Sequence, residues 1–498
     1  MTKTPAYAEL CRVHARLYRY YHLSSIVGWD RNAMMPPKGN EARAAAEAEL
    51  NALIHRARTE ARLGEWLRAA EQEPLDDFER ANLREMKRDW HEATALPESL
   101  IEAKTIAGAR CEHAWRNQRP ANDWRGFLEN FREVVRLARE EARLLAAGSG
   151  LSRYDALLDR YEPGARAVDI ERLFADLKSW LPDLVARAEA RQRSGRVTAP
   201  SGPFPVADQR ALNVEIMKLL GFDFEAGRLD ESAHPFSGGV PEDLRLTTRY
   251  REDDLLQSLM GTIHETGHAR YEQNLPREWL GQPIGVARSY GIHESQSLSF
   301  EMQLARGRAF AGLLAPRLAH RFGAQPAFEA GNFHKLLTRV KRGFIRVEAD
   351  EATYPAHVML RFEIERALIE GEIEAEDIPA LWDGKMDALL GLDTRGNYQD
   401  GCLQDAHWTE GAFGYFPSYT LGAMYAAQWF AAMRSAVPDL DARIAQGDLG
   451  PVFDWLRANI WSQASRWETP ELVRRASGEA LNPAHFRAHL EARYLGAG

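Results

Sequence analysis

The sequence predicts an all-α protein, predominantly helical, with one small β-sheet beside a cleft. Two observations support this fold class. Ala, Leu, Glu and Arg recur at helical spacing along most of the chain, most clearly over residues 41–70, 124–147 and 170–191. In contrast, one segment, residues 245–250, alternates branched and charged residues as a strand does.

The most informative segment for function is residues 264–268, His-Glu-Thr-Gly-His. Two histidines four residues apart on a helix point the same way and can hold one zinc ion, with Glu265 beside the metal as a general base. The two aspartates at residues 253–254 precede an apolar stripe, and Pro276 follows it, so the motif is expected on a helix. Gly267 costs a helix about 1 kcal/mol relative to Ala, which indicates close backbone packing near the metal.

A catalytic zinc ion usually has three protein ligands and a water, so a third ligand is needed. Residues 289–297 lead into an apolar pattern at 298–305, which fits a second helix with a carboxylate at its first turn. Glu294 is that carboxylate and the predicted third ligand, which makes the set that of a gluzincin. His293 competes for the role, but adjacent residues on a helix point about 100° apart, so at most one of the two faces the metal.

The partners that orient the zinc histidines are not evident in the sequence. Many gluzincins place an Asp four residues after the third ligand, where this chain has Leu298. A ligating imidazole nearly always donates its other nitrogen to a carboxylate or a carbonyl, so such a group is expected from elsewhere.

This ligand set predicts peptide hydrolysis. Zinc with two imidazoles and one carboxylate lowers the pKa of a bound water toward about 7. Glu265 would take that proton and pass it to the departing amine. Tyr415 and Tyr419, on a Gly- and Pro-shaped stretch at residues 413–419, are candidate donors to the oxyanion; packing in an aromatic core is the alternative role for each.

Beyond the zinc motif, further blocks occur in a fixed order: His-Pro-Phe at 234–236, Asp-Leu-Arg-Leu-Thr-Thr-Arg-Tyr at 243–250, His-Glu-Ser-Gln at 293–296, Ile-Arg-Val-Glu-Ala-Asp at 345–350 and Gly-Cys-Leu-Gln-Asp-Ala-His-Trp at 401–408, which continues into 414–419. With these blocks the chain resembles the zinc metallocarboxypeptidases named after carboxypeptidase Taq. The resemblance extends to residues 28–37 and 154–164 and so covers nearly the whole chain.

The resemblance implies an enzyme that removes single amino acids from the free C-terminus of peptides, with broad side-chain tolerance. It also implies a helical homodimer with a deep groove and one Zn²⁺ per chain, which Co²⁺ or another divalent ion could replace. Carried over to this sequence, His264, His268 and Glu294 bind the metal, Glu265 is the base and acid, and Arg346 holds the substrate's terminal carboxylate.

An arginine suits that last role, because its planar fork meets a carboxylate through two parallel hydrogen bonds. The alternative for Arg346 is a structural ion pair with Glu348 or Asp350. Arg245 and Arg249 are weaker candidates for the same contact.

Two histidines in the family's blocks, His234 and His407, are expected to line the substrate cleft. Each lies close to an aromatic residue in a turn-rich context. The alternative for each is a buried histidine whose nitrogens are satisfied by the protein.

The whole chain, residues 1–498, is expected to form one metallocarboxypeptidase unit. Within it, residues 1–150 are expected to form a helical, lid-like region over the cleft, and residues 151–498 the catalytic region. The strand at 245–250, just before the zinc helix, could pair with an extended peptide substrate.

Composition sets further limits. With 63 basic and 72 acidic side chains the formal net charge is −9, which argues against a nucleic-acid partner. The first 23 residues lack the apolar core of a signal peptide, and no run of 18 apolar residues occurs, so a cytoplasmic protein without a membrane partner is expected. Three distant cysteines argue against a disulfide framework.

Two other functions are compatible with the motif. A zinc oligopeptidase that cuts inside short peptides would share every metal residue but would not need an arginine for a free carboxylate. A non-catalytic helical scaffold could use zinc for structure, but such a site is usually closed by four protein ligands and gains nothing from Glu265.

Overall fold

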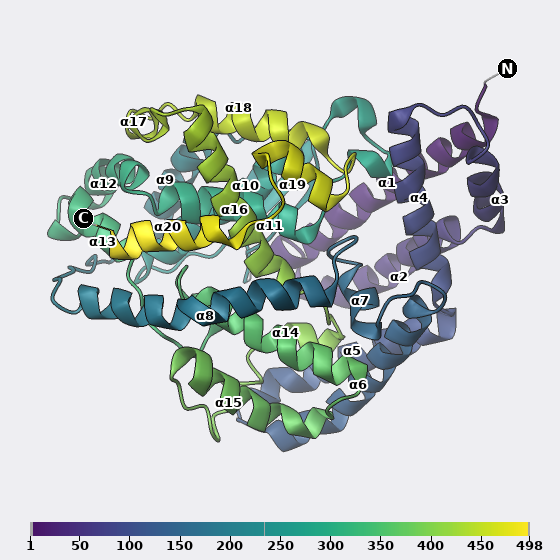
Figure 1. Cartoon of the computed structure of the whole chain (residues 1–498), viewed down its shortest axis with the longest axis horizontal. Coiled ribbons are helices and arrows are strands. Elements are labelled where there is room, and N and C mark those ends of the chain that lie inside the picture. Colours follow the sequence, from purple (N-terminus) through teal and green to yellow (C-terminus); the bar gives the residue numbers. More distant parts are fainter. Residues whose placement is uncertain (1–2, 234, 497–498) are drawn as a thin grey trace.

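The computed structural model describes residues 3–233 and 235–496, and it confirms the predominantly helical class (Figure 1). The helices before the sheet are α1 (Pro5–Ala33), α2 (Asn40–Arg58), α3 (Ala61–Ala70), α4 (Asp77–Ala95), α5 (Glu98–Gln118), α6 (Trp124–Ala146), α7 (Arg153–Leu158), α8 (Ala167–Gln192) and α9 (Val206–Leu219). Within the described residues no helix is both long enough and apolar enough to span a bilayer.

The helices after the sheet carry the candidate site and most of the main core. They are α10 (Leu255–Gln273), α11 (Tyr290–Leu298), α12 (Arg308–Phe322), α13 (Ala330–Leu337), α14 (Tyr354–Glu370), α15 (Ile378–Leu390), α16 (Pro417–Ala436), α17 (Leu440–Ala445), α18 (Gly450–Asn459), α19 (Thr469–Ser477) and α20 (Pro483–Leu495). A π-helical turn, η4 (Ser299–Ala305), continues α11.

The helical pattern at residues 41–70 is divided between α2 and α3. The hydroxyl of Thr59 donates to the carbonyl of His55 at 2.9 Å, and Thr59 itself leaves helical geometry. A threonine whose side chain bonds back to the preceding turn offers the backbone an alternative to helix continuation, which accounts for the break.

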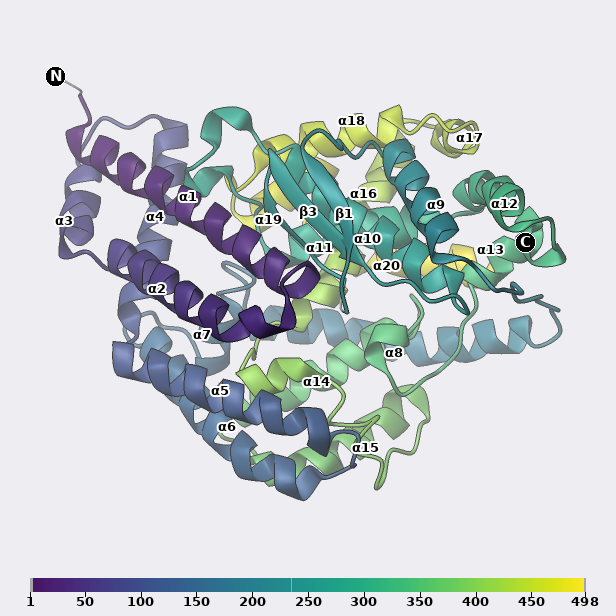
Figure 2. The ribbon, with the colours of Figure 1, turned by 180° about the vertical axis from the view of Figure 1, so that it is seen from behind.

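The sheet has three strands, β1 (Gly227–Glu231), β2 (Ser237–Val240) and β3 (Asp243–Thr248), in the order β1-β3-β2. β1 runs parallel to β3, and β2 runs antiparallel to it. Figure 2 shows the sheet over α10, with α1 beside it.

The strand predicted at residues 245–250 therefore exists, two residues earlier, but its predicted role is wrong. β3 is the central strand, and β1 and β2 take up the hydrogen-bonding groups on its two edges, so it cannot pair with a substrate. The edge strand on the cavity side is β2, whose Ser237 lines the cavity described below.

Among the described residues, two large apolar cores stand out beside a smaller one under the sheet. Buried side chains of α1–α4, between residues 6 and 86, form a cluster of their own. Side chains of α5 and α6 instead belong to the main core, which extends to α20. Figures 1 and 2 place α1–α4 at the end of the molecule opposite α12, α13 and α17. The lid-like region predicted for residues 1–150 stays a prediction. The separate apolar core of the N-terminal helices ends with α4.

Three helices meet closely where the predicted metal ligands lie. A Cβ atom at Gly267 of α10 would lie 2.5 Å from the carbonyl oxygen of Gln296 and 2.6 Å from the Cα of Ser297, both on α11. On the opposite side of α11, a Cβ at Gly422 of α16 would lie 2.8 Å from the Cβ of Glu294. The close packing expected from Gly267 is confirmed, because only glycine permits this distance.

We expect Gly267→Ala to lower the free energy of unfolding by about 1–3 kcal/mol, because the added methyl group must push α10 and α11 apart. Denaturant unfolding of the metal-free protein measures this change. Gly261 lies on the same helix with no heavy atom within 4 Å of its would-be Cβ. Gly261→Ala is therefore the control and should be neutral or stabilising, by up to about 1 kcal/mol. Equal effects of the two variants would contradict the packing argument.

Candidate active site

The two zinc-motif histidines lie on α10, which begins after the aspartates that the sequence indicates, and the predicted third ligand lies on α11, which begins early enough to put Glu294 in its second turn. The side chain of Asp254 accepts a hydrogen bond from the Gln257 amide at 3.1 Å and starts α10. Ser289 accepts from the Ile292 amide at 3.1 Å and starts α11. Side-chain oxygens at this position satisfy amides that lack a helical partner, which fixes the register of both helices.

A buried carboxylate ties α11 to its surroundings. Glu162 accepts hydrogen bonds from the backbone amide of Gly291 and, at 2.8 Å, from the hydroxyl of Ser418 at the start of α16. Burial raises the pKa of Glu162, although these hydrogen bonds oppose the rise. Glu162 thus joins the N-termini of the two helices that carry Glu294 and Tyr419.

His264, His268 and Glu294 form one compact group. The Nε2 atoms of His268 and His264 lie 3.4 Å and 3.9 Å from the same oxygen of Glu294. One ligand atom from each residue lies within 4.8 Å of the other two. Bonds of about 2 Å from three such atoms can converge on one ion. Glu294, rather than His293, therefore stands with the two histidines.

The charges around this group favour a cation. Burial alone would lower the pKa of His264, but the carboxylates of Glu294, Glu301 and Glu265 overcome it and raise that pKa to about 10. The two imidazoles in turn hold the pKa of Glu294 below its usual value despite burial. The carboxylates thus make the potential at His264 negative, which suits a divalent ion, whereas burial and His293 lower the pKa of His268.

The partner of His264 is Glu301, which the sequence analysis did not identify. The Nδ1 atom of His264 lies 2.9 Å from Glu301 Oε2, and Arg306 donates to the other oxygen at 2.7 Å. Burial opposes ionisation of Glu301, but Arg306 and His264 lower its pKa to about 2. Glu301 follows Glu294 by seven residues, which is two helical turns, so a carboxylate at that spacing was the available signal.

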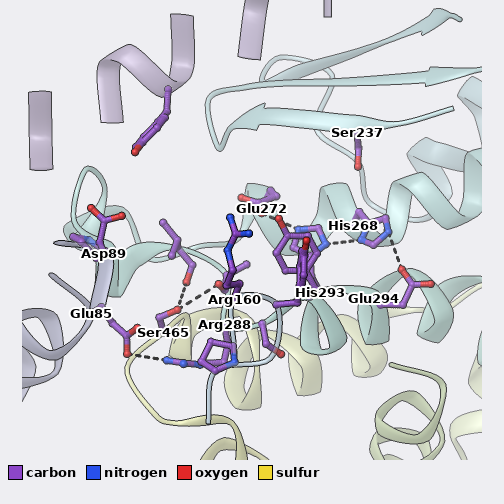
Figure 3. Close-up of a pocket in the computed structure, with 18 of the residues that line it drawn as sticks. Glu85, Asp89, Arg160, Ser237, His268, Glu272, Arg288, His293, Glu294 and Ser465 are labelled. Atoms are coloured by element: carbon purple, nitrogen blue, oxygen red, sulfur yellow. Dashed lines mark hydrogen bonds and ion pairs between the residues drawn. The ribbon is translucent and has the colours of Figure 1, made fainter. Parts of the chain in front are cut away.

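The partner of His268 is a second histidine. The Nδ1 atoms of His268 and His293 lie 2.6 Å apart, with the ring centroids 4.6 Å apart and the ring planes inclined by 29°. His293 Nε2 lies 2.8 Å from Glu272 Oε1 (Figure 3). His293, the alternative third metal ligand in the sequence analysis, thus contacts the predicted metal ligand His268 instead.

A cavity of about 800 Å³ opens onto the metal group. Its lining residues come from α1, α4, the β2 edge, α10, α11 and α16, and from the segments at 160–163 and 281–289 and just before α16; Figure 3 shows part of this lining. Of the predicted site residues, those that line it are His264, Glu265, His268, Glu294, Tyr415 and Tyr419. The rings of Tyr415, Tyr161 and Tyr290 pack edge to face at 5.2–5.4 Å along one wall. His234 lies outside the described residues.

Arg346 does not line the cavity. Its Nε donates to Asp405 Oδ1 at 3.0 Å, and its guanidinium lies 4.9 Å from the ring of Tyr419, a residue that does line the cavity. The counter-ion is therefore Asp405, not Glu348 or Asp350. Asp405 also accepts from Arg361 Nε at 2.7 Å. One carboxylate between two arginines leaves this buried cluster with one excess positive charge.

His407 connects this cluster with the cavity wall. Its Nε2 lies 3.4 Å from the hydroxyl of Tyr419, and its ring packs against Tyr415 and Phe416 at 5.3 and 4.8 Å. Burial and the positive charge of Arg346 lower the pKa of His407 to about 4. His407 is thus a neutral polar group behind the tyrosines.

The two weaker arginine candidates lie elsewhere. Arg245 pairs with Asp243 at 2.9 Å and stacks on Trp29 at 4.3 Å. Arg249 donates to Gln257 at 3.1 Å. Neither belongs to the described residues that line the cavity.

Comparison with known proteins agrees with this geometry. The profile of the family described as Carboxypeptidase Taq (M32) metallopeptidase matches residues 9–494. The chain belongs to this family. Thermostable carboxypeptidase 1 of Thermus thermophilus is 40% identical, with 99% of each chain covered, and carboxypeptidase 1 of Bacillus subtilis is 33% identical, with 96% of each covered. The solved structure of Trypanosoma cruzi metallocarboxypeptidase 1 is 47% identical, covers 99% of each chain and superposes with a TM-score of 0.97.

The family resemblance inferred from the sequence is thereby confirmed, and the protein is a metallocarboxypeptidase, a peptide hydrolase that uses a divalent metal. These curated relatives are named carboxypeptidases. They favour neither the oligopeptidase nor the non-catalytic scaffold.

We expect Asp405→Asn to destabilise the protein at neutral pH by roughly 3–5 kcal/mol, because Arg346 and the fully buried Arg361 lose their shared counter-charge. Denaturant unfolding measures the loss. The arginines hold the pKa of Asp405 below its usual value of 3.8 despite burial. The stabilisation by this carboxylate is therefore present above pH 3.8 and is lost as the pH falls below it, so the variant and the wild type should converge in acid.

The matched control is Asp393→Asn, since Asp393 also pairs with an arginine, Arg395, but at the exposed surface. It should change stability little. A comparable loss in both variants would contradict the buried-cluster argument.

Proposed function

We propose that this metallocarboxypeptidase uses Zn²⁺ and removes single residues from the free C-terminus of peptides, with Glu265 as general base and acid. The observation that carries this proposal is the convergence of His264, His268 and Glu294 beside a cavity that Glu265 also lines. Two nitrogens and one carboxylate oxygen, with a fourth position left open, are the donor set of a catalytic zinc site.

The metal ligands would be His264, His268 and Glu294, and Co²⁺ or another divalent ion could take the same place. When bound, the ion supplies Lewis acidity that polarises a peptide carbonyl and lowers the pKa of water. The side chains of the protein fix its position, since both imidazoles are held at Nδ1 by neighbouring groups.

Glu265 would accept a proton from the attacking water and deliver it to the departing amine, a role usually worth about 10²- to 10⁴-fold in rate. Its place next to His264 on α10 and on the cavity wall supports this role. The hydroxyls of Tyr415 and Tyr419 would donate to the developing oxyanion, because both residues line the same cavity.

Recognition of a free carboxylate would come from the Arg346, Asp405 and Arg361 cluster. Its one excess positive charge lies directly behind Tyr419, in a buried place where water screens it little. Arg346 would act on the substrate's terminal carboxylate from this side, with His407 and Tyr419 as the polar groups between. We retain His234 as a proposed cleft residue from its sequence block alone.

The remaining features follow the family resemblance. We propose broad side-chain tolerance, in keeping with a cavity of about 800 Å³. We also propose a cytoplasmic homodimer, in which residues 1–150 contribute a lid-like region over the cleft. Residues of α1 and α4 that line the cavity support that placement.

A peptide offered both as free acid and as C-terminal amide tests the function. The metal-loaded protein should shorten only the free acid, one residue at a time, and a chelator should stop the reaction. Mass spectrometry follows the products. Internal cuts in both peptides would instead establish an oligopeptidase, and no cleavage of either would leave a metal-binding scaffold.

Glu265→Gln should retain the metal and lose nearly all turnover, because the amide cannot accept the proton of the attacking water. The kcat for the free-acid peptide, together with the metal content of the purified variant, measures this effect. Full activity in the variant would rule out Glu265 as the base.

A further inference from the structure

The support of His268 differs from that of His264. Glu301 contacts the Nδ1 of His264 directly, whereas His293 stands between His268 and the carboxylate of Glu272. We infer that Glu272, acting through His293, sets which nitrogen of His268 carries the hydrogen and thereby prepares His268 to bind the metal. This inference rests on the proposed metal site. Glu272 and His293 are positioning residues, since neither would touch the metal or the substrate's reacting atoms.

The hydrogen positions follow from the distances. The Nε2 of His268 faces Glu294 Oε2 at 3.4 Å and is the atom in the ligand group, so it must present a lone pair. A neutral imidazole has one N–H and one lone pair. The hydrogen of His268 must therefore be on Nδ1.

That hydrogen needs an acceptor, and the nearest atom is His293 Nδ1 at 2.6 Å. Two N–H groups cannot point at each other over this distance, so His293 Nδ1 carries the lone pair and His293 Nε2 carries the hydrogen. Glu272 Oε1 lies 2.8 Å from His293 Nε2 and accepts it. Glu272 needs a hydrogen on His293 Nε2, and metal binding needs a lone pair on His268 Nε2. For neutral His268 and His293, only one placement of the two ring hydrogens satisfies both requirements.

Without an acceptor at residue 272, that arrangement is no longer enforced. His293 could then carry its hydrogen on Nδ1 and donate it to His268. His268 would be left with its hydrogen on Nε2, the atom that must bind the metal. Loss of Glu272 is therefore expected to weaken metal binding, although two hydrogen bonds and the ring of His293 separate Glu272 from His268.

The place of Glu272 fits a functional role better than a stabilising one. It lies in the last turn of α10, where a negative charge is unfavourable for the helix dipole. Its side chain is 24% exposed and lines the cavity rather than the core. It follows His268 by four residues and so shares its face of the helix. The rings of His293 and His268 meet edge to edge, with 29° between their planes, so the two Nδ1 atoms point at each other.

The test is Zn²⁺ affinity of the full chain, measured by competition with a chromophoric chelator. Glu272→Leu should weaken binding about 10- to 100-fold, as losses of groups that orient ligating histidines usually do. Glu272→Gln keeps an oxygen that can accept from His293 Nε2 and should retain most of the affinity. His293→Asn keeps an acceptor for His268 Nδ1, so it should bind Zn²⁺ more tightly than His293→Leu.

A structural role would not give this rescue pattern. The melting temperatures of the metal-free variants should therefore stay near that of the wild type. The control variant is Glu278→Leu, which removes an exposed glutamate six residues after Glu272 and should leave Zn²⁺ affinity unchanged. Wild-type affinity in Glu272→Leu, or equal losses in Glu272→Leu and Glu272→Gln, would overturn the inference.

The proposed metal site has its own test in the same assay. His264→Ala should abolish tight Zn²⁺ binding. If His264→Ala binds Zn²⁺ as the wild type does, the ligand assignment fails. If His264→Ala loses binding while Glu272→Leu keeps it, only the tautomer inference fails.

Discussion

The contact between α10 and α11 at Gly267 is the constraint on which the site depends. With no side chain there, the backbone of α11 approaches within the distance that a Cβ would occupy, and Glu294 comes within 3.4 Å of His268. Gly422 lets α16 approach the other side of Glu294 in the same way. The three ligand side chains are thus placed by helix packing rather than by loops, which gives them little freedom to separate when no ion is bound.

Burial of these charged groups is tolerable because each has an ionic or hydrogen-bonding partner. Glu294 faces two imidazoles, and Glu301 lies between His264 and Arg306. On the other side of Tyr419, one aspartate serves two arginines, so the cluster keeps an excess positive charge. The negative charge of Glu294 and the excess positive charge of the Arg346, Asp405 and Arg361 cluster are both close to Tyr419. That separation of charge is the electrostatic basis of the proposed selectivity for free C-termini.

Much of this site could be predicted from local sequence. The spacing of His264 and His268, the acidic helix start at Asp253 and Asp254, and the cost of a glycine within a helix are properties of neighbouring residues. The role of Glu301 was also within reach, because two helical turns separate it from Glu294. The role predicted for β3 was wrong because strand order depends on β1 and β2, and no feature within residues 245–250 indicates which strand is central.

The sequence by itself determined the helical class, the His264–His268 motif with its proposed third ligand, and the family. Those depend on helical periodicity and on short spacings, which a chain fixes locally. Only the tertiary structure decided that Asp405 is the counter-ion of Arg346 across 59 residues, and that His293 and Glu272, 21 residues apart, together support His268. Such pairs form where separate elements pack, and their distances follow from the packing of whole helices rather than from residue types.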